Sequence, residues 1–162
     1  MKIVAALAIA LLAAAAPAAA QDKPTLDLAE FFAGRTHGEG TMKRALKRPA
    51  RITIDTVGQR GKGGELILVD TIKEEGQPTK TRRWVMRATP NGYTGSISDA
   101  TGPVKVEVKG ATATIRYKMK EGGISVHQVL TMRDRKTLAS NVTGKKLGVR
   151  VARIDATIRK VD

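Results

Sequence analysis

The chain of 162 residues contains no cysteine, so no disulfide can contribute to its fold. Stability must therefore come from a buried core, and a chain of this length can bury roughly two-thirds of the surface that it exposes when unfolded. The absence of cysteine also removes the residue that carries the lipid anchor of bacterial lipoproteins. We therefore expect a protein without such an anchor.

Aromatic residues are scarce, at 3% of the chain. Proteins that bind single-stranded nucleic acid stack the bases on aromatic side chains. Basic stretches at 43–51 and 116–120 could contact phosphates, but Phe31 and Phe32 belong to an apolar helical pattern instead. The sequence therefore predicts no nucleic-acid partner.

Histidine occurs only twice, and neither copy has a partner at metal-ligand spacing. His37 lies in a loop flanked by glycines and His127 alternates away from an apolar stripe, so we expect both at the surface. No serine lies in a nucleophile-elbow motif. The glycines at 61–64 lack the pattern and following helix of a phosphate-binding loop. We expect no enzymatic activity, no metal and no cofactor.

Long apolar runs are missing after the N-terminus. Lys2 precedes an apolar run at 3–16, and three alanines at 18–20 precede the polar Gln21, which is the pattern of a secretory signal peptide. We interpret residues 1–20 as a signal peptide and residues 21–162 as a single domain. The mature protein is expected to be periplasmic or secreted.

Acidic residues are also under-represented. The chain has 29 Lys and Arg against 15 Asp and Glu, a formal net charge of +14. A field of this sign favours anionic partners such as phospholipid headgroups or acidic polysaccharide. Because we expect export, an anionic envelope surface is the partner that the charge favours.

The most regular pattern in the chain is a β-hairpin over residues 82–99. Its first arm alternates between two faces, as a strand with one buried side does. Pro-Asn-Gly at 90–92 supplies the turn, because Asn and Gly tolerate the positive φ of tight hairpins. The residues expected on its buried face are Trp84, Met86, Ala88, Tyr93, Gly95 and Ile97.

Shorter copies of this alternation continue along most of the chain, with turn signals roughly every ten residues. A phase slip between Val151 and Ile154 indicates a β-bulge. A barrel or a sandwich could close such a sheet, and consecutive hairpins without long crossovers favour the barrel. We therefore predict an all-β, antiparallel up-and-down barrel of about 8–10 strands. A short helix over residues 26–32, capped by Thr25, is expected to plug one end.

The interior of such a barrel either holds a ligand or is filled by side chains. The first hypothesis is an apolar or lipidic ligand, with or without an anionic group, held inside. The alternative is a non-catalytic structural or interaction protein with a filled barrel that docks on anionic envelope surfaces. Asp70 and Asp99 interrupt or close apolar stripes, and Asp70 could pair with an arginine inside or lie near a rim. The candidate ligand-binding residues are Trp84, Met86, Tyr93, Tyr117, Leu130, Asp70 and Asp99.

Several segments resemble one family. The sequence LDLAEFFAG at 26–34, followed by Gly-Glu-Gly at 38–40, resembles the opening of a bacterial envelope family known as domain of unknown function 3833. The Arg-Trp pair at 83–84 and the strand at 113–118 match as well. The resemblance spans essentially the whole of 21–162 and implies a lipocalin-like β-barrel in the envelope. It implies no established activity.

The signal-peptide pattern generates a first prediction. If cleavage follows Ala20, the mature protein begins at Gln21 and is recovered in a periplasmic or culture fraction. N-terminal sequencing of the fractionated protein checks this. Recovery of the full-length chain in the cytosol, with Met1 retained, would overturn it.

Overall fold

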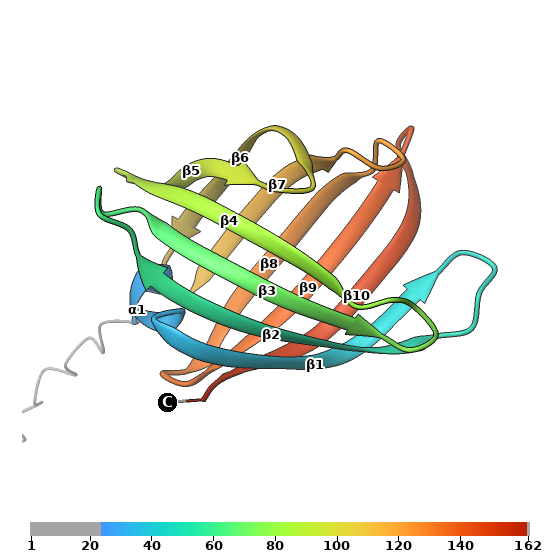
Figure 1. The fold of residues 1–162 in the computed structure, drawn as a ribbon, viewed down its shortest axis with the longest axis horizontal. Helices are drawn as coiled ribbons and strands as arrows, with labels where there is room; N and C mark the ends of the chain where they lie inside the picture. The colour runs from blue at the N-terminus through green and yellow to red at the C-terminus, as the bar shows by residue number, and fades with distance from the viewer. Residues whose placement is uncertain (1–23, 162) are drawn as a thin grey trace, which may run out of the picture.

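The computed structural model describes residues 24–161, so the predicted signal peptide lies outside the described residues. The described part contains one short helix and ten strands (Figure 1). The elements are α1 (Leu28–Phe31), β1 (Gly34–Arg44), β2 (Ala50–Arg60), β3 (Leu66–Glu74), β4 (Lys80–Thr89), β5 (Gly92–Ile97), β6 (Ala100–Lys109), β7 (Thr112–Met119), β8 (Ser125–Asp134), β9 (Thr137–Lys146) and β10 (Val149–Lys160).

Every strand pairs in antiparallel fashion with the strands before and after it in the chain, and β1 pairs with β10 to close the barrel. The closing register runs from Thr36 opposite Lys160 to Arg44 opposite Ala152. This confirms the predicted all-β up-and-down barrel. Because each connection is a hairpin, five of the turns lie at one end of the barrel, which we call the open end. The helix covers the other end, the helix end.

Strand alternation separates an apolar interior from a polar exterior. On β3 the buried residues are Leu66, Leu68 and Asp70, as the period of two predicts. The predicted β-bulge is present, with a register shift between Arg150 and Ala152 where β10 pairs with β9. Ala88 is an exception, because it lies exposed near the end of β4.

The N-terminal helix is shorter than predicted, and Asp27 rather than Thr25 caps it. The Asp27 side chain accepts a hydrogen bond from the Glu30 backbone N–H at 3.0 Å. Leu26 precedes the helix, and its N–H donates to the carbonyl of Gly110 in the β6–β7 turn at 2.8 Å. The helix therefore begins two residues later than expected, and Leu26 is tied to the barrel instead.

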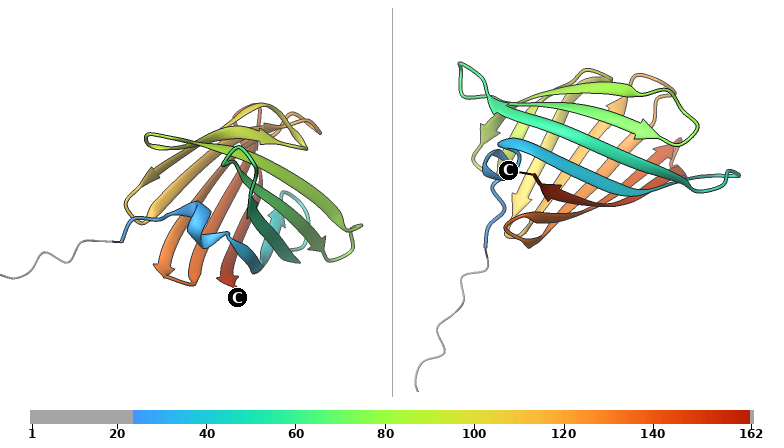
Figure 2. Two further views of the ribbon diagram at one scale, coloured as in Figure 1. Left: turned by 60° about the vertical axis from the view of Figure 1, so that its left-hand side comes forward. Right: turned by 60° about the horizontal axis from the view of Figure 1, so that its bottom comes forward.

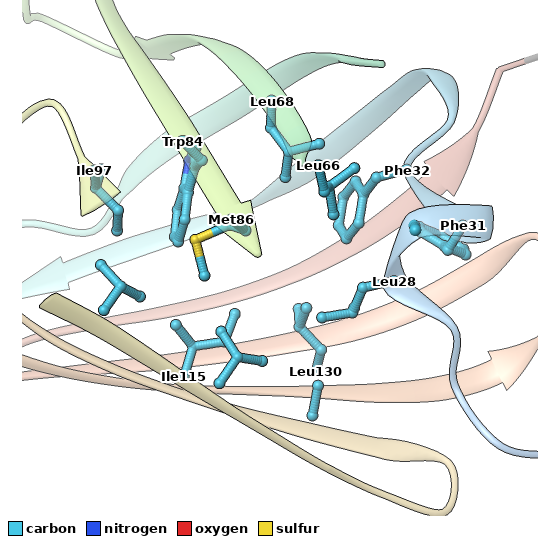
Figure 3. Close-up of a cluster of buried hydrophobic side chains, with 14 of the residues drawn as sticks. Leu28, Phe31, Phe32, Leu66, Leu68, Trp84, Met86, Ile97, Ile115 and Leu130 are labelled. Carbon is cyan, nitrogen blue, oxygen red and sulfur yellow. The ribbon is translucent and has the colours of Figure 1, made fainter. Parts of the chain in front are cut away.

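The helix lies across the barrel opening, with Leu28 and Phe32 pointing at the core (Figures 2 and 3). Leu28, Phe31 and Phe32 are all buried. The Phe32 carbonyl lies directly over Gly58 of β2, and a Cβ at that position would collide with its oxygen. Lys160 donates to the Glu30 carbonyl at 2.7 Å, which ties the end of β10 to the helix. The helix therefore plugs this end as predicted.

Removal of the plug's aromatic anchor should destabilise the whole barrel. Phe32→Ala is expected to lower the free energy of unfolding by about 3–5 kcal/mol, because a buried ring is lost and a void remains. Val57→Ala, on the half-exposed outer face of β2, should cost less than about 1 kcal/mol. Urea unfolding followed by circular dichroism measures both. An unchanged value for Phe32→Ala would show that the helix contributes nothing to the fold.

Candidate functional site

The barrel surrounds a cavity of about 460 Å³. The half of the cavity near the helix end is apolar, and α1 closes it (Figure 3). Ligand pockets for small molecules have volumes of roughly 300–1,000 Å³, so this space is large enough for one. The apolar half is lined by Leu28, Phe32, Leu66, Met86, Tyr93, Val106, Ile115 and Leu130.

A buried carboxyl group lies about midway along the cavity wall. Asp70 is 7% exposed and accepts a hydrogen bond from Trp84 Nε1 and one from Thr56 Oγ1, each at 2.7 Å. Burial raises the pKa of Asp70, and the two hydrogen bonds oppose this rise only in part. The indole of Trp84 is therefore held in one orientation against the cavity.

Arg82 links the open end of this cluster to a second carboxylate. Its Nε and Nη2 donate to Asp99 Oδ2 at 3.0 and 2.8 Å, and its Nη1 donates to the Tyr117 hydroxyl at 3.2 Å. The guanidinium carbon lies 6.0 Å from the centroid of the Trp84 ring and 5.8 Å from that of Tyr117. The two rings meet edge to face at 5.8 Å. Burial raises the pKa of Tyr117, so its hydroxyl stays neutral at physiological pH.

The opposite wall carries a smaller polar pair. Gln128 Nε2 donates to Ser140 Oγ at 3.0 Å, and Ser140 is buried. Both residues line the cavity. Together with Thr56 and Asp70, they form a polar belt between the apolar half and the open end.

Charged side chains surround the cavity at the open end. Arg44 forms a two-pronged ion pair with Glu74, in which Nη2 lies 2.8 Å from Oε2. Lys80, Arg153 and Glu121 also line the cavity, and all three are exposed. The mouth is therefore polar and mainly cationic, whereas the far end is apolar.

Six of the seven candidate residues line the cavity. They are Trp84, Met86, Tyr93, Tyr117, Leu130 and Asp70. The seventh, Asp99, lies in the β5–β6 turn and acts through Arg82. Of the two positions that the sequence left open for Asp70, the structure shows the one inside the barrel, but its hydrogen-bond partners are Thr56 and Trp84 and not an arginine.

Tyr93 lies at the helix end, close to Asp27 and Ala29, and burial raises the pKa of its hydroxyl. It is beside the β4–β5 turn, as predicted, but that turn is at the plugged end of the barrel. Tyr93 is therefore far from the open mouth, where Lys80 lines the cavity.

Sequence reasoning did not identify Arg82, Thr56 or Gln128 as site residues. Arg82 lies two positions before Trp84 on the same strand face, which was the available signal. Arg83 and Arg87, on the other face, are exposed. Thr56 and Gln128 looked like ordinary members of their strands, and only the register across the sheet shows their partners.

The two histidines lie on the outer face of the barrel. His127 is exposed, as predicted. His37 belongs to β1 rather than to a glycine-rich connection, and its Nδ1 lies 2.6 Å from Asp55 Oδ1. The hydrogen bond to Asp55 is the main cause of the raised pKa of His37. No group of three or more His, Cys, Asp or Glu among residues 24–161 is arranged to hold a metal ion.

A closed antiparallel barrel around an internal cavity places this protein among the lipocalin-like barrels. The chain belongs to the family described as protein of unknown function DUF3833, whose model matches residues 6–160. This confirms the family resemblance found in the sequence. A search of curated proteins gave no match.

One solved structure supports the fold, and two others were matched with lower scores. The S-type phycobiliprotein lyase CPES from Guillardia theta superposes with a TM-score of 0.63 at 6% identity, over 83% of this chain and 90% of that one. A redesigned β-barrel, b11L5F_LGL, gives 0.47 at 11% identity over 83% and 95%. The barrel EF1p2_mFAP2b bound to DFHBI gives 0.45 at 13% over 83% and 100%. At these identities the likeness concerns the fold alone. Within the described residues, no helix is both long and apolar enough to cross a membrane.

The buried carboxyl of Asp70 generates a pH-dependent prediction. Because its pKa is raised above the ordinary 3.8, the folded state binds this proton more tightly than the unfolded state. The contribution of Asp70 to the free energy of unfolding is therefore greatest below pH 3.8 and is lost as the pH rises through the folded pKa. Asp70→Asn removes this dependence. The wild-type free energy minus that of Asp70→Asn should fall with rising pH in urea titrations.

Asp155 supplies a control of opposite sign. The hydrogen bond from Arg153 lowers the pKa of Asp155, so its contribution is present above its ordinary pKa and lost on acidification. The wild-type free energy minus that of Asp155→Asn should therefore rise slightly with pH. A flat or rising difference for Asp70→Asn would contradict the raised pKa.

Proposed function

We propose that this protein binds one apolar or amphipathic small molecule, of the lipid class, inside its barrel and catalyses no reaction on it. The cavity of about 460 Å³ supports this proposal most strongly, because a barrel that served only as a solid scaffold would fill its interior with side chains. The structure thus favours the first hypothesis from the sequence over the filled barrel.

The polarity of the wall gives the ligand a direction. Leu28 and Phe32 would contact its apolar end, and the polar belt at Asp70 would meet any group in the middle. A headgroup would lie at the open end. Lys80 and Arg153 are exposed cations on the cavity wall there, against the single exposed anion Glu121, so an anionic headgroup is favoured over a cationic one.

The ion pair between Arg82 and Asp99 occupies the Arg82 guanidinium, so this arginine does not bind the charged group of the ligand. Both Arg82 donors that face Asp99 bind the same oxygen, and the third reaches Tyr117. The arginine is thus already partnered, and its role in binding is to hold Trp84 and Tyr117 in place. We also propose export to the periplasm or cell exterior, where such a protein would carry or store its ligand.

Trp84 provides a direct assay, because it is the only tryptophan in the chain and lines the cavity. Titration with palmitate should shift its emission to shorter wavelength as water leaves the cavity. Hexadecanol, which has the same tail without charge, should also bind. Only the affinity for palmitate should fall with added salt, since the charge at the mouth is screened.

Two matched variants separate the interior from the exterior. Ala156→Phe places a ring in the cavity and should weaken binding of both ligands by about tenfold or more, because it occupies the space of the tail. Ala139→Phe adds the same ring to the outer face of the neighbouring strand and should leave affinity unchanged. If neither ligand shifts the emission, or if both variants bind like the wild type, the proposal is wrong.

A further inference from the structure

Two leucines at the open end have no role in the fold. Leu46 in the β1–β2 turn and Leu147 in the β9–β10 turn are 107% and 96% exposed. Burial of leucine is normally a main source of stability, and here none is gained. Both turns lie on the right-hand side of the barrel in Figure 1. The pairing of Ala45 N–H with the Val151 carbonyl at 3.1 Å makes their hairpins direct neighbours.

The backbone at both positions is unfavourable for leucine. Leu46 has φ of 62° and Leu147 has φ of 49°, and they are the only non-glycine residues with positive φ in the described part of the chain. Glycine or asparagine adopts this conformation at lower cost. Neither packing nor turn geometry therefore explains why leucine occupies these tips.

The two leucines lie among cations. Residues 43–50 contain four Lys or Arg and residues 144–151 contain three, and neither stretch has an acidic residue. Arg44 is paired with Glu74. The remaining six are exposed: Lys43, Lys47, Arg48, Lys145, Lys146 and Arg150.

We propose that the β1–β2 and β9–β10 turns form a docking surface for a bilayer containing anionic phospholipid. Leu46 and Leu147 insert among the acyl chains, and the six cations contact the phosphate groups. The contact places the mouth of the cavity against the membrane. This surface is separate from the cavity, so the inference goes beyond the proposed function and does not depend on it.

A bilayer fits these features better than a protein or polysaccharide partner. Two isolated leucines on separate turns do not form the continuous apolar centre of a protein interface. An anionic polysaccharide would use the cations but would gain nothing from the leucines. Only a surface with an anionic plane above an apolar layer uses both kinds of side chain.

Vesicle co-sedimentation tests the proposal. Protein that begins at Gln21 contains the whole described barrel and lacks the apolar run at 3–16, which could itself bind lipid. It should bind vesicles of phosphatidylcholine and phosphatidylglycerol, bind pure phosphatidylcholine far more weakly, and lose affinity as salt rises. Lys47→Glu with Arg48→Glu should weaken binding by at least about fivefold per cation.

Leu46→Asn and Leu147→Asn provide the sharpest variants, because asparagine tolerates positive φ. Each should leave the melting temperature unchanged or higher while weakening vesicle binding by about tenfold. Val57→Thr removes an exposed apolar side chain from the barrel wall and should bind like the wild type. Binding of palmitate inside the barrel should be unaffected by all three.

Two outcomes would overturn the proposal. If the asparagine variants bind anionic vesicles as tightly as the wild type, the leucines do not insert. The surface is a general polyanion site if the wild type binds dextran sulfate as tightly as it binds anionic vesicles, and if the two leucine variants bind both ligands as tightly as the wild type does. Failure of palmitate binding alone would leave the docking surface intact, and would count only against the proposed function.

Discussion

The pairing of β1 with β10 is the constraint on which the rest of this structure depends. Without it the sheet would have two exposed edges and no enclosed interior. The small residues along this seam allow the two strands to approach closely. A Cβ at Gly40 would lie 2.6 Å from the Cβ of Ala156, and it would collide with the Asp155 carbonyl. The first and last strands of the chain must therefore meet before the cavity exists, and this long-range contact carries a high cost in loop entropy.

Inside the closed barrel, the charged side chains of Asp70 and Arg82, which would be costly alone, each have hydrogen-bond partners. The carboxyl of Asp70 satisfies the Trp84 indole and the Thr56 hydroxyl, and Asp99 neutralises Arg82. The belt therefore remains ordered without a ligand. It divides the interior into an apolar half beneath it and a charged mouth above it. In the proposed function, this division, rather than any single residue, decides how a ligand would lie in the cavity.

Local periodicity predicted the barrel because most strands have one apolar face. In the hairpin of β4 and β5, the predicted buried face is correct at Trp84, Met86 and Ile97 and wrong at Ala88, which is exposed. The prediction from periodicity failed at the start of β1, where glycines interrupt the alternation of apolar and polar side chains. Gly34, Gly38 and Gly40 made the start of β1 look irregular, although these glycines serve the close seam with β10 and β2. The helix cap was misplaced because Thr25 and Asp27 are both good caps, and it is the Asp27 side chain that accepts a hydrogen bond from the Glu30 N–H.

Strand periodicity also explains why part of the candidate site could be predicted. Residues on the inner faces were identified, since their direction follows from the strand period. The partner of Asp70 was not, because the choice between Arg82 and Thr56 depends on register and side-chain reach across three strands. The two turn leucines gave no periodic signal at all. Their significance comes from backbone angles that a sequence does not display.

The two ends of the described chain lie together at the helix end. The helix that begins the fold and the final strand are joined there by Lys160 and Glu30, and Val161 N–H donates to the Arg35 carbonyl at 2.8 Å (Figure 2). A reporter domain, an affinity tag or a solid support can therefore be fused at either terminus without covering the mouth. The arrangement suits the barrel to use as a surface-immobilised capture reagent, with every copy presenting its entrance to the sample.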